Sequence, residues 1–188
     1  IARAFAQIID AKSPFTSGHS ERVAVYADMI AAELDFTAER RRWLKRAALL
    51  HDIGKLGVSN AILDKNGKLD DAEWQDMRNH AALSETILAR VAVFHEMACI
   101  GGGHHERLDG KGYPRGLKGD AIVPEIRIVS VADVFDALTA DRPYRAAMPL
   151  EKALGIMRAD VGTAFDPACF AALERALAAI EGDLARAA

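Results

Sequence analysis

Residues 44–55 read LKRAALLHDIGK, an apolar helical segment that runs directly into a histidine and an aspartate. Its core-type side chains recur at i, i+3, i+4 and i+7, namely Leu44, Ala47, Ala48 and His51. That spacing places them on one face of a helix. The segment therefore predicts that a helix ends at His51 and Asp52, so that two metal-capable side chains emerge where the chain turns over the core.

The same helical periodicity extends outward over most of the chain. Another stripe is formed by Val23, Ala27, Ile30 and Leu34. Alternating strand patterns are nearly absent. We expect helices near residues 1–12, 18–35, 38–52, 70–89, 124–140, 149–159 and 166–182. The sequence thus predicts an all-α bundle, formed by a single domain over residues 1–188.

The longest expected loop runs from Gly101 to Pro124 and holds 7 of the 14 glycines of the chain. Irregular segments of this length usually carry function. Gly101, Gly102 and Gly103 are followed by His104 rather than by a Lys-Ser or Lys-Thr pair, which argues against a phosphate-binding glycine loop. We expect a flexible hinge at these three glycines.

Composition narrows the classes of partner. Apolar residues make up 51% of the 188 residues, and the formal net charge is -3. A charge so near neutrality provides no general attraction for a nucleic-acid polymer or an anionic membrane. The chain has no apolar run of 18 or more residues, which argues against membrane insertion. Cys99 and Cys169 lie far apart in apolar surroundings, so we expect buried free thiols in a reducing cytoplasm.

The N-terminus suggests a longer protein. The chain starts at Ile1 rather than at a methionine, and Ile1, Phe5 and Ile8 lie along one face of the first expected helix. We interpret the chain as a domain excised from a longer protein with an upstream regulatory module. The apolar face of this N-terminal helix predicts a homodimer contact.

Five of the six histidines stand in settings that favour metal binding over an ordinary core role. An isolated histidine beside a capping aspartate would favour the core role, because a neutral imidazole needs only one hydrogen bond there. His104 and His105 are adjacent in a glycine-rich segment, and two neighbouring core histidines would need hydrogen-bond partners in two directions at once. The five are His19, His51, His80, His104 and His105.

Asp133 is the most informative carboxylate. It lies in residues 128–135, which read IVSVADVF, so its helix is expected to be largely buried. An unpaired carboxylate in that environment costs several kcal/mol or takes up a proton. Coordination to a metal removes this cost, and the alternative is a buried salt bridge to Arg127 or Arg142.

Five imidazoles and the carboxylates of Asp52 and Asp133, with no thiolate among them, suit iron, manganese, nickel, cobalt or zinc. The ligand types do not choose between these metals. If Asp52 bridges two ions, several coordination positions remain for water, hydroxide and substrate oxygens. A metal-activated hydroxide would then replace a protein nucleophile.

Residues 51–55 (HDIGK) and 104–114 (HHERLDGKGYP) together closely resemble the HD-GYP family of cyclic-di-GMP phosphodiesterases. The resemblance continues through residues 133–139 and 142–145 and covers essentially the whole chain. It implies an HD-domain helical bundle whose long Gly-rich loop carries the Gly-Tyr-Pro motif. It also implies seven metal ligands, which are His19, His51, Asp52, His80, His104, His105 and Asp133.

The resemblance extends to the substrate contacts. Lys55, Arg142 and Arg145 are similar to the family's phosphate-contacting cations, although a solvated helix end would also explain the two arginines. Tyr113 either supports a guanine ring or holds the loop in shape. We expect Asp52 and Lys55 to be the catalytic residues.

The family also bears on the number of metals. Members that bind three metals have a glutamate four residues before the first histidine ligand, where this chain has Phe15. The resemblance therefore implies two divalent transition-metal ions. We expect these ions to be iron or manganese, with nickel, cobalt or zinc as alternatives.

The implied reaction is hydrolysis of cyclic-di-GMP to the linear dinucleotide, with GMP as a possible further product. One alternative is a hydrolase of another nucleotide, such as a mixed cyclic dinucleotide or a guanosine polyphosphate. A second is a catalytically silent module that senses cyclic-di-GMP. Docking on diguanylate cyclase domains through the Gly-Tyr-Pro loop is a further expected interaction.

Overall fold

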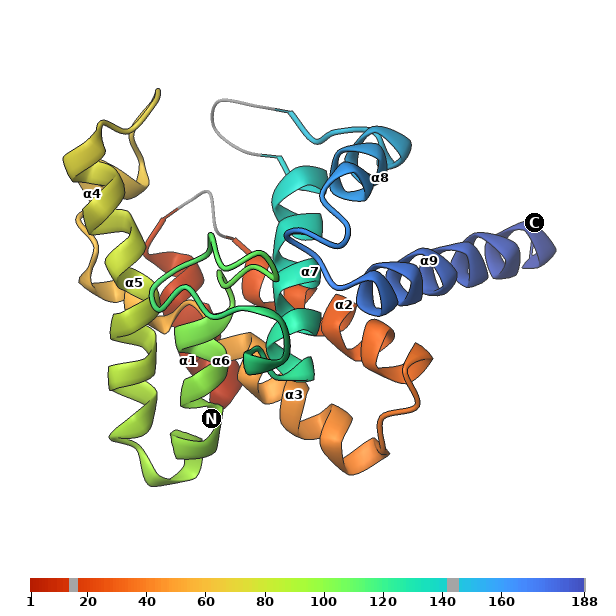
Figure 1. Cartoon of the computed structure of the whole chain (residues 1–188), viewed down its shortest axis with the longest axis horizontal. Coiled ribbons are helices and arrows are strands. Elements are labelled where there is room, and N and C mark those ends of the chain that lie inside the picture. The colour runs from red at the N-terminus through yellow and green to blue at the C-terminus, as the bar shows by residue number, and fades with distance from the viewer. Residues whose placement is uncertain (14–16, 142–145, 188) are drawn as a thin grey trace.

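The computed structural model describes residues 1–13, 17–141 and 146–187, and this part of the chain is helical with no β-strand (Figure 1). The predicted all-α class is confirmed. All seven expected helices are present within a few residues of their predicted ends. They are α1 (Ala2–Ala11), α2 (His19–Glu33), α3 (Ala38–Leu50), α5 (Asp71–Ala89), α7 (Pro124–Thr139), α8 (Leu150–Ala159) and α9 (Pro167–Ala187).

Local sequence sets several helix starts. The Thr37 hydroxyl accepts the backbone N–H of Arg40 at the start of α3. Asp70 and Glu73 form a reciprocal capping box at the start of α5. Each arrangement satisfies N–H groups that have no partner within the helix. Pro124 occupies the first turn of α7, where its missing N–H costs nothing.

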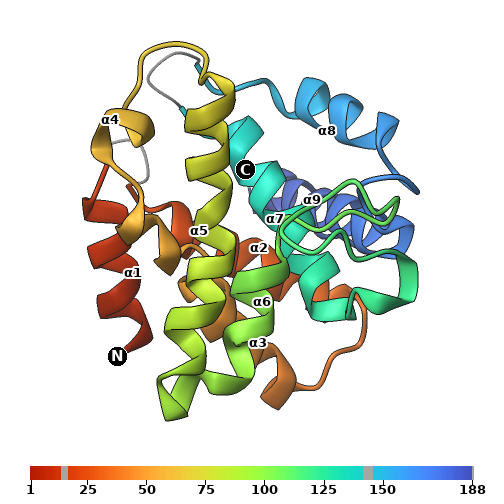
Figure 2. The same ribbon diagram turned by 60° about the vertical axis from the view of Figure 1, so that its left-hand side comes forward.

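Short helical segments connect these helices. They are η1 (Ile53–Gly57), α4 (Asn60–Leu63), η2 (Ala92–Met97), α6 (Ala98–Gly103) and η3 (Gly119–Ala121). Helix α2 packs against α3, α7 and α9, whereas α5 packs against η1 and α6. Helix α6 also contacts α3 and α7, so it joins these two groups (Figure 2). The core between them includes the fully buried side chains of Ile30, Leu50, Ile100 and Ile128.

The predicted glycine hinge is wrong. Gly101, Gly102 and Gly103 are buried and belong to α6, so the loop starts only at His104. A Cβ at Gly101 would lie 2.9 Å from the Ser84 Cβ of α5, and one at Gly103 would lie 2.5 Å from an Ile126 methyl of α7. The glycines are needed because α6 packs closely against both neighbours, not because the chain bends there.

The predictions for the two cysteines, for a dimer contact through α1 and for membrane insertion have different outcomes. Cys169 is buried as expected, but Cys99 is exposed, because it lies on the outer side of the short helix α6. Ile1 and Ile8 are 89% and 54% exposed, and the homodimer through α1 stays a prediction. No helix in the described ranges is long and apolar enough to cross a membrane.

Candidate metal centre

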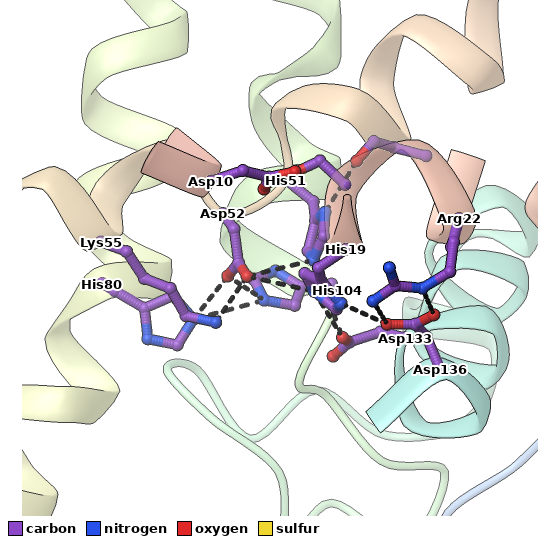
Figure 3. Close-up of polar contacts among 12 residues, drawn as sticks. Asp10, His19, Arg22, His51, Asp52, Lys55, His80, His104, Asp133 and Asp136 are labelled. Atoms are coloured by element: carbon purple, nitrogen blue, oxygen red, sulfur yellow. Dashed lines mark hydrogen bonds and ion pairs between the residues drawn. The ribbon is translucent and has the colours of Figure 1, made fainter. Parts of the chain in front are cut away.

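The seven predicted ligands converge from distant parts of the chain into one cluster. Figure 3 labels all of them except His105. His19 begins α2, His51 and Asp52 follow α3, and His80 lies within α5. His104 ends α6, His105 follows it, and Asp133 lies within α7. Each of these side chains is buried except that of His105, which is half-buried. The described structure therefore gathers residues that are up to 114 positions apart, from His19 to Asp133.

Asp52 lies at the middle of this cluster. One oxygen, Oδ2, is 3.5 Å from His19 Nε2 and 3.4 Å from His51 Nε2. The other, Oδ1, is 3.3 Å from His80 Nε2 and 3.6 Å from His104 Nε2. The two oxygens of one carboxylate thus face two different pairs of histidines, which is the geometry that a bridging ligand requires.

The outer donors complete the two halves of the cluster. Asp133 Oδ1 is 3.3 Å from His19 Nε2 and 3.8 Å from His51 Nε2. On the other side, His105 Nε2 is 3.1 Å from His80 Nε2. The donor atoms of His19, His51 and Asp133 lie within 4.8 Å of one another, as do those of His80, His104 and His105. Either group could hold a metal ion.

Backbone carbonyls fix the orientation of three imidazoles. In each ring Nδ1 lies on the carbonyl oxygen three residues earlier, and the pairs are His51–Ala48 at 2.7 Å, His80–Met77 at 2.5 Å and His104–Gly101 at 2.9 Å. An Nδ1–H that donates to a carbonyl leaves the lone pair on Nε2. All three Nε2 atoms face Asp52, which is the orientation that these rings would need to bind a metal.

Asp136 fixes His19 in a different way. Its Oδ2 lies 2.7 Å from His19 Nδ1, and its Oδ1 accepts a 2.6 Å hydrogen bond from Arg22 Nε (Figure 3). Our sequence analysis gave neither Arg22 nor Asp136 a role in orienting His19. The signal was present in the spacing, because Arg22 follows His19 by three residues and Asp136 follows Asp133 by three residues on neighbouring helices.

The electrostatics of the cluster fit a bound cation. Three buried atoms have no hydrogen-bond partner within the described residues: His19 Nε2, His51 Nε2 and Asp52 Oδ1. Burial lowers the pKa of His19, but the neighbouring carboxylates of Asp133, Asp136 and Asp52 outweigh it and raise that pKa to about 10. Burial lowers the pKa of His80 to about 4, so this ring keeps its lone pair. Orphaned buried polar atoms are costly, and coordination to a metal would satisfy all three.

The salt-bridge explanation for Asp133 is not supported within the described residues. Arg127 points elsewhere, because its guanidinium donates to Asp166 at 2.8 Å and to the Ile122 carbonyl at 2.7 Å. Asp133 instead faces the imidazoles of His19 and His51. Arg142, the other proposed partner, lies outside the described residues, as do Arg145 and Phe15.

Lys55 lies beside the bridging carboxylate. It belongs to η1, and its Nζ is 2.5 Å from Asp52 Oδ2 (Figure 3). This ammonium group is partly exposed, so it lies between the buried cluster and the solvent. A cation at this place can reach an anion that binds to the cluster from outside.

The loop after His105 folds back onto the cluster. The Tyr113 ring stacks on the His105 ring, with centroids 4.7 Å apart and an angle of 29° between the planes. Glu106, which is buried, accepts the backbone N–H groups of Arg115 and Leu117, each at 2.8 Å. Sequence reasoning gave Glu106 no role. These contacts favour the loop-shaping role for Tyr113, and its contact with a guanine stays a prediction.

A helical bundle with this buried histidine and aspartate cluster defines the class of HD-superfamily phosphohydrolase domains. A family model described as the HD domain matches residues 3–169. The chain belongs to the HD domain family, and its relatives together with residues 51–55 and 104–114 place it in the HD-GYP type.

Two curated relatives are both named as phosphodiesterases that act on a cyclic dinucleotide. The "3'3'-cGAMP-specific phosphodiesterase 3" of Vibrio cholerae serotype O1 is 62% identical over 177 residues, which are 94% of this chain and 38% of the relative. The "Cyclic di-GMP phosphodiesterase response regulator RpfG" of Xanthomonas campestris pv. campestris is 40% identical over 94% of this chain and 47% of the relative. The chain therefore spans less than half the length of these curated relatives.

Two solved structures support the fold. The crystal structure of the cyclic GMP-AMP-specific phosphodiesterase V-cGAP3 from V. cholerae shares 56% sequence identity, with a TM-score of 0.61 over 94% of this chain and 40% of that chain. The HD-GYP-type protein Bd1817 from Bdellovibrio bacteriovorus has a TM-score of 0.71 over 85% of this chain and 51% of that chain. Its sequence identity is 21%, so it supports the fold alone.

Asp136→Asn is expected to weaken metal binding by about ten- to a hundredfold, because the amide no longer balances the charge of a metal-bound imidazole. Competition with a coloured chelator would measure the dissociation constant. The matched control is Asp28→Asn, since Asp28 also lies between two cations, Arg41 and Lys45, but away from the cluster. Equal affinities for the two variants would contradict the positioning role of Asp136.

Proposed function

We propose that this domain is a metal-dependent phosphodiesterase that opens a cyclic dinucleotide. The observation that carries the proposal is the position of Asp52, whose two oxygens face two separate histidine pairs. The buried unpartnered atoms around it fit two cations held side by side. Such a pair suits a phosphodiester, which presents two non-bridging oxygens at one phosphorus.

The chain's own residues would divide into two ligand sets that share Asp52. One set comprises His19, His51, Asp52 and Asp133, and the other comprises Asp52, His80, His104 and His105. Two bound ions, which we propose to be iron or manganese, would supply Lewis acidity and a nucleophile at neutral pH. Lys55 would neutralise a phosphate oxygen, and the tyrosine-stacked His105 would hold the loop over the substrate.

Two cyclic dinucleotides compete as the substrate. The cyclic-di-GMP prediction is supported by the relative named as a cyclic di-GMP phosphodiesterase. The more similar relative is named as specific for 3'3'-cGAMP, and this similarity favours 3'3'-cGAMP as the first substrate to test. A silent sensor is disfavoured because all seven donor residues are present and converge. Docking on a diguanylate cyclase domain stays a prediction.

The test is a substrate comparison with anaerobically purified, metal-assayed protein. 3'3'-cGAMP, cyclic-di-GMP and cyclic-di-AMP would be incubated in parallel, and the products would be separated by chromatography. We expect a linear dinucleotide from 3'3'-cGAMP or cyclic-di-GMP. If protein with a full metal complement hydrolyses none of the three, the proposed function is wrong.

Arg142→Ala and Arg145→Ala are each expected to raise KM about ten- to a hundredfold while metal content is unchanged. A charge-assisted contact to phosphate contributes roughly 1.5–3 kcal/mol. Steady-state kinetics and elemental analysis would be run together. Arg158→Ala is the control, because Arg158 pairs with Glu174 on the surface. An unchanged KM in both variants would indicate that these arginines are solvated surface residues that do not contact the substrate.

We also predict two metals rather than three. Phenylalanine at position 15 supplies no oxygen donor, and Asp136 is engaged by His19 and Arg22. Elemental analysis of protein purified without chelator should give about two ions per chain, and anomalous scattering would locate them. Three fully occupied peaks within bonding reach of the cluster would disprove this prediction.

A further inference from the structure

A groove lies between α4, the segment that follows it and the N-terminal half of α5. Its volume is about 610 Å³, which is within the range of small-molecule sites. The lining is mainly apolar, with lysines among the lining residues: Ile62, Leu63, Lys65, Lys68, Trp74 and Met77. Trp74 is 46% exposed, so part of its ring is available to a ligand.

A line of stacked side chains joins this groove to the metal ligands. The guanidinium carbon of Arg78 is 5.8 Å from the Trp74 ring centroid and 5.4 Å from the Tyr113 ring centroid. Tyr113 in turn stacks on His105. The Trp74 end of the groove is therefore connected to the metal centre by contacts between side chains of α5 and the Gly-Tyr-Pro loop, which are distant in sequence.

Helix α5 fixes the separation of the two sites along its axis. Trp74 precedes His80 by six residues, which corresponds to about 9 Å along the helix axis. Met77 lies between them, lines the groove, and accepts the His80 Nδ1–H on its carbonyl oxygen. One nucleotide unit can bridge such a separation, with its phosphate at the metal centre and its base in the groove.

The two charged residues that line the groove, Lys65 and Lys68, are both cations. Arg78 and Lys68 are both exposed, and neither forms an ion pair with a carboxylate in the described part of the chain. Lys65 is paired with Glu73 and adds no net charge. A cyclic dinucleotide carries two phosphates, so one phosphate at the metals leaves the second for a cation such as Arg78.

We propose that Trp74 and Arg78 form a base-recognition subsite, in which a purine of the cyclic dinucleotide stacks on the exposed indole and Arg78 contacts the adjoining phosphate. Stacking on aromatic rings is a general way to bind nucleobases. The subsite rests on the proposed function, and it would determine how tightly the substrate binds rather than how its phosphodiester bond is cleaved.

The kinetic test compares two substrates in Trp74→Ala. The ratio of kcat/KM for 3'3'-cGAMP to kcat/KM for methyl 4-nitrophenyl phosphate, a phosphodiester without a base, should fall about ten- to a hundredfold. General damage to the metal centre or the fold would lower both values and leave the ratio unchanged. Trp43→Ala is the matched control, because it removes the only other tryptophan, on α3. An unchanged ratio in Trp74→Ala would overturn the subsite.

A binding test does not depend on turnover. In a metal-loaded Trp43→Phe protein, the emission of Trp74 should be quenched by a non-hydrolysable phosphorothioate analogue of 3'3'-cGAMP and, more weakly, by GMP. In the corresponding Trp74→Phe protein the emission of Trp43 should not change. If wild-type protein hydrolyses no cyclic dinucleotide, the proposed function fails, and this titration alone decides the subsite. Absence of quenching by both nucleotides would overturn it.

Discussion

Asp52→Asn is expected to lower turnover of the cyclic dinucleotide by about a thousandfold or more and to reduce the bound metal. An amide has one weakly donating oxygen, so it cannot bridge two cations as a carboxylate does. Lewis-acid stabilisation by paired ions is worth several kcal/mol, and each 1.4 kcal/mol is a tenfold change in rate. The effect should be large because Asp52 is the residue that faces both histidine pairs.

Product formation and metal content would be measured on the same preparation of this variant. The Asp28→Asn protein again serves as the control, because it removes a carboxylate from α2 without touching the cluster. Circular dichroism would show that both variants are folded. Near wild-type turnover by folded Asp52→Asn protein would refute the bridging role.

Gly54→Ala should lower the free energy of unfolding by about 1–3 kcal/mol or more, although the added group is a single methyl. A Cβ at Gly54 would lie 1.9 Å from the carbonyl oxygen of His80 and 2.6 Å from the backbone nitrogen of Ser84. Backbone atoms cannot rotate aside as a side chain can, so η1 and α5 must separate. Because α5 carries His80, metal binding should weaken together with stability.

Thermal unfolding and metal affinity would be measured for Gly54→Ala beside Gly155→Ala. Gly155 lies in α8 and is exposed, and a Cβ added there would face open space. Alanine there should stabilise the helix by about 0.5–1 kcal/mol. Because both changes replace glycine with alanine, the comparison separates the effect of the steric contact from the effect of helix propensity. A Gly54→Ala protein as stable as the wild type would show that η1 and α5 are not closely packed.

The positions of the candidate metal ligands could be predicted from the sequence because their signals are local. A histidine at the end of an apolar helix, or a carboxylate inside one, is unusual within a window of a few residues. The helices could also be predicted, because their periodicity and their caps depend on residues that are near one another in the sequence. Asp133 is an example, since its apolar surroundings alone predicted burial, and its side chain is buried against His19 and His51.

The supporting contacts were decided by tertiary structure. Asp136 acquires its role only when α7 packs on α2, which brings it to His19. The glycines of α6 resembled a hinge because their composition is typical of loops, but close packing against α5 and α7 requires them.

Sequence by itself therefore determined the helical class, the family and the candidate donor residues of the proposed metal centre, since each depends on residue type and short-range spacing. Only the folded chain decided which carboxylate faces both histidine pairs, which residues orient the imidazoles, and that Trp74 is connected through Arg78 to Tyr113. The physical reason is that helix periodicity fixes which face of a helix is buried but not which helix covers it.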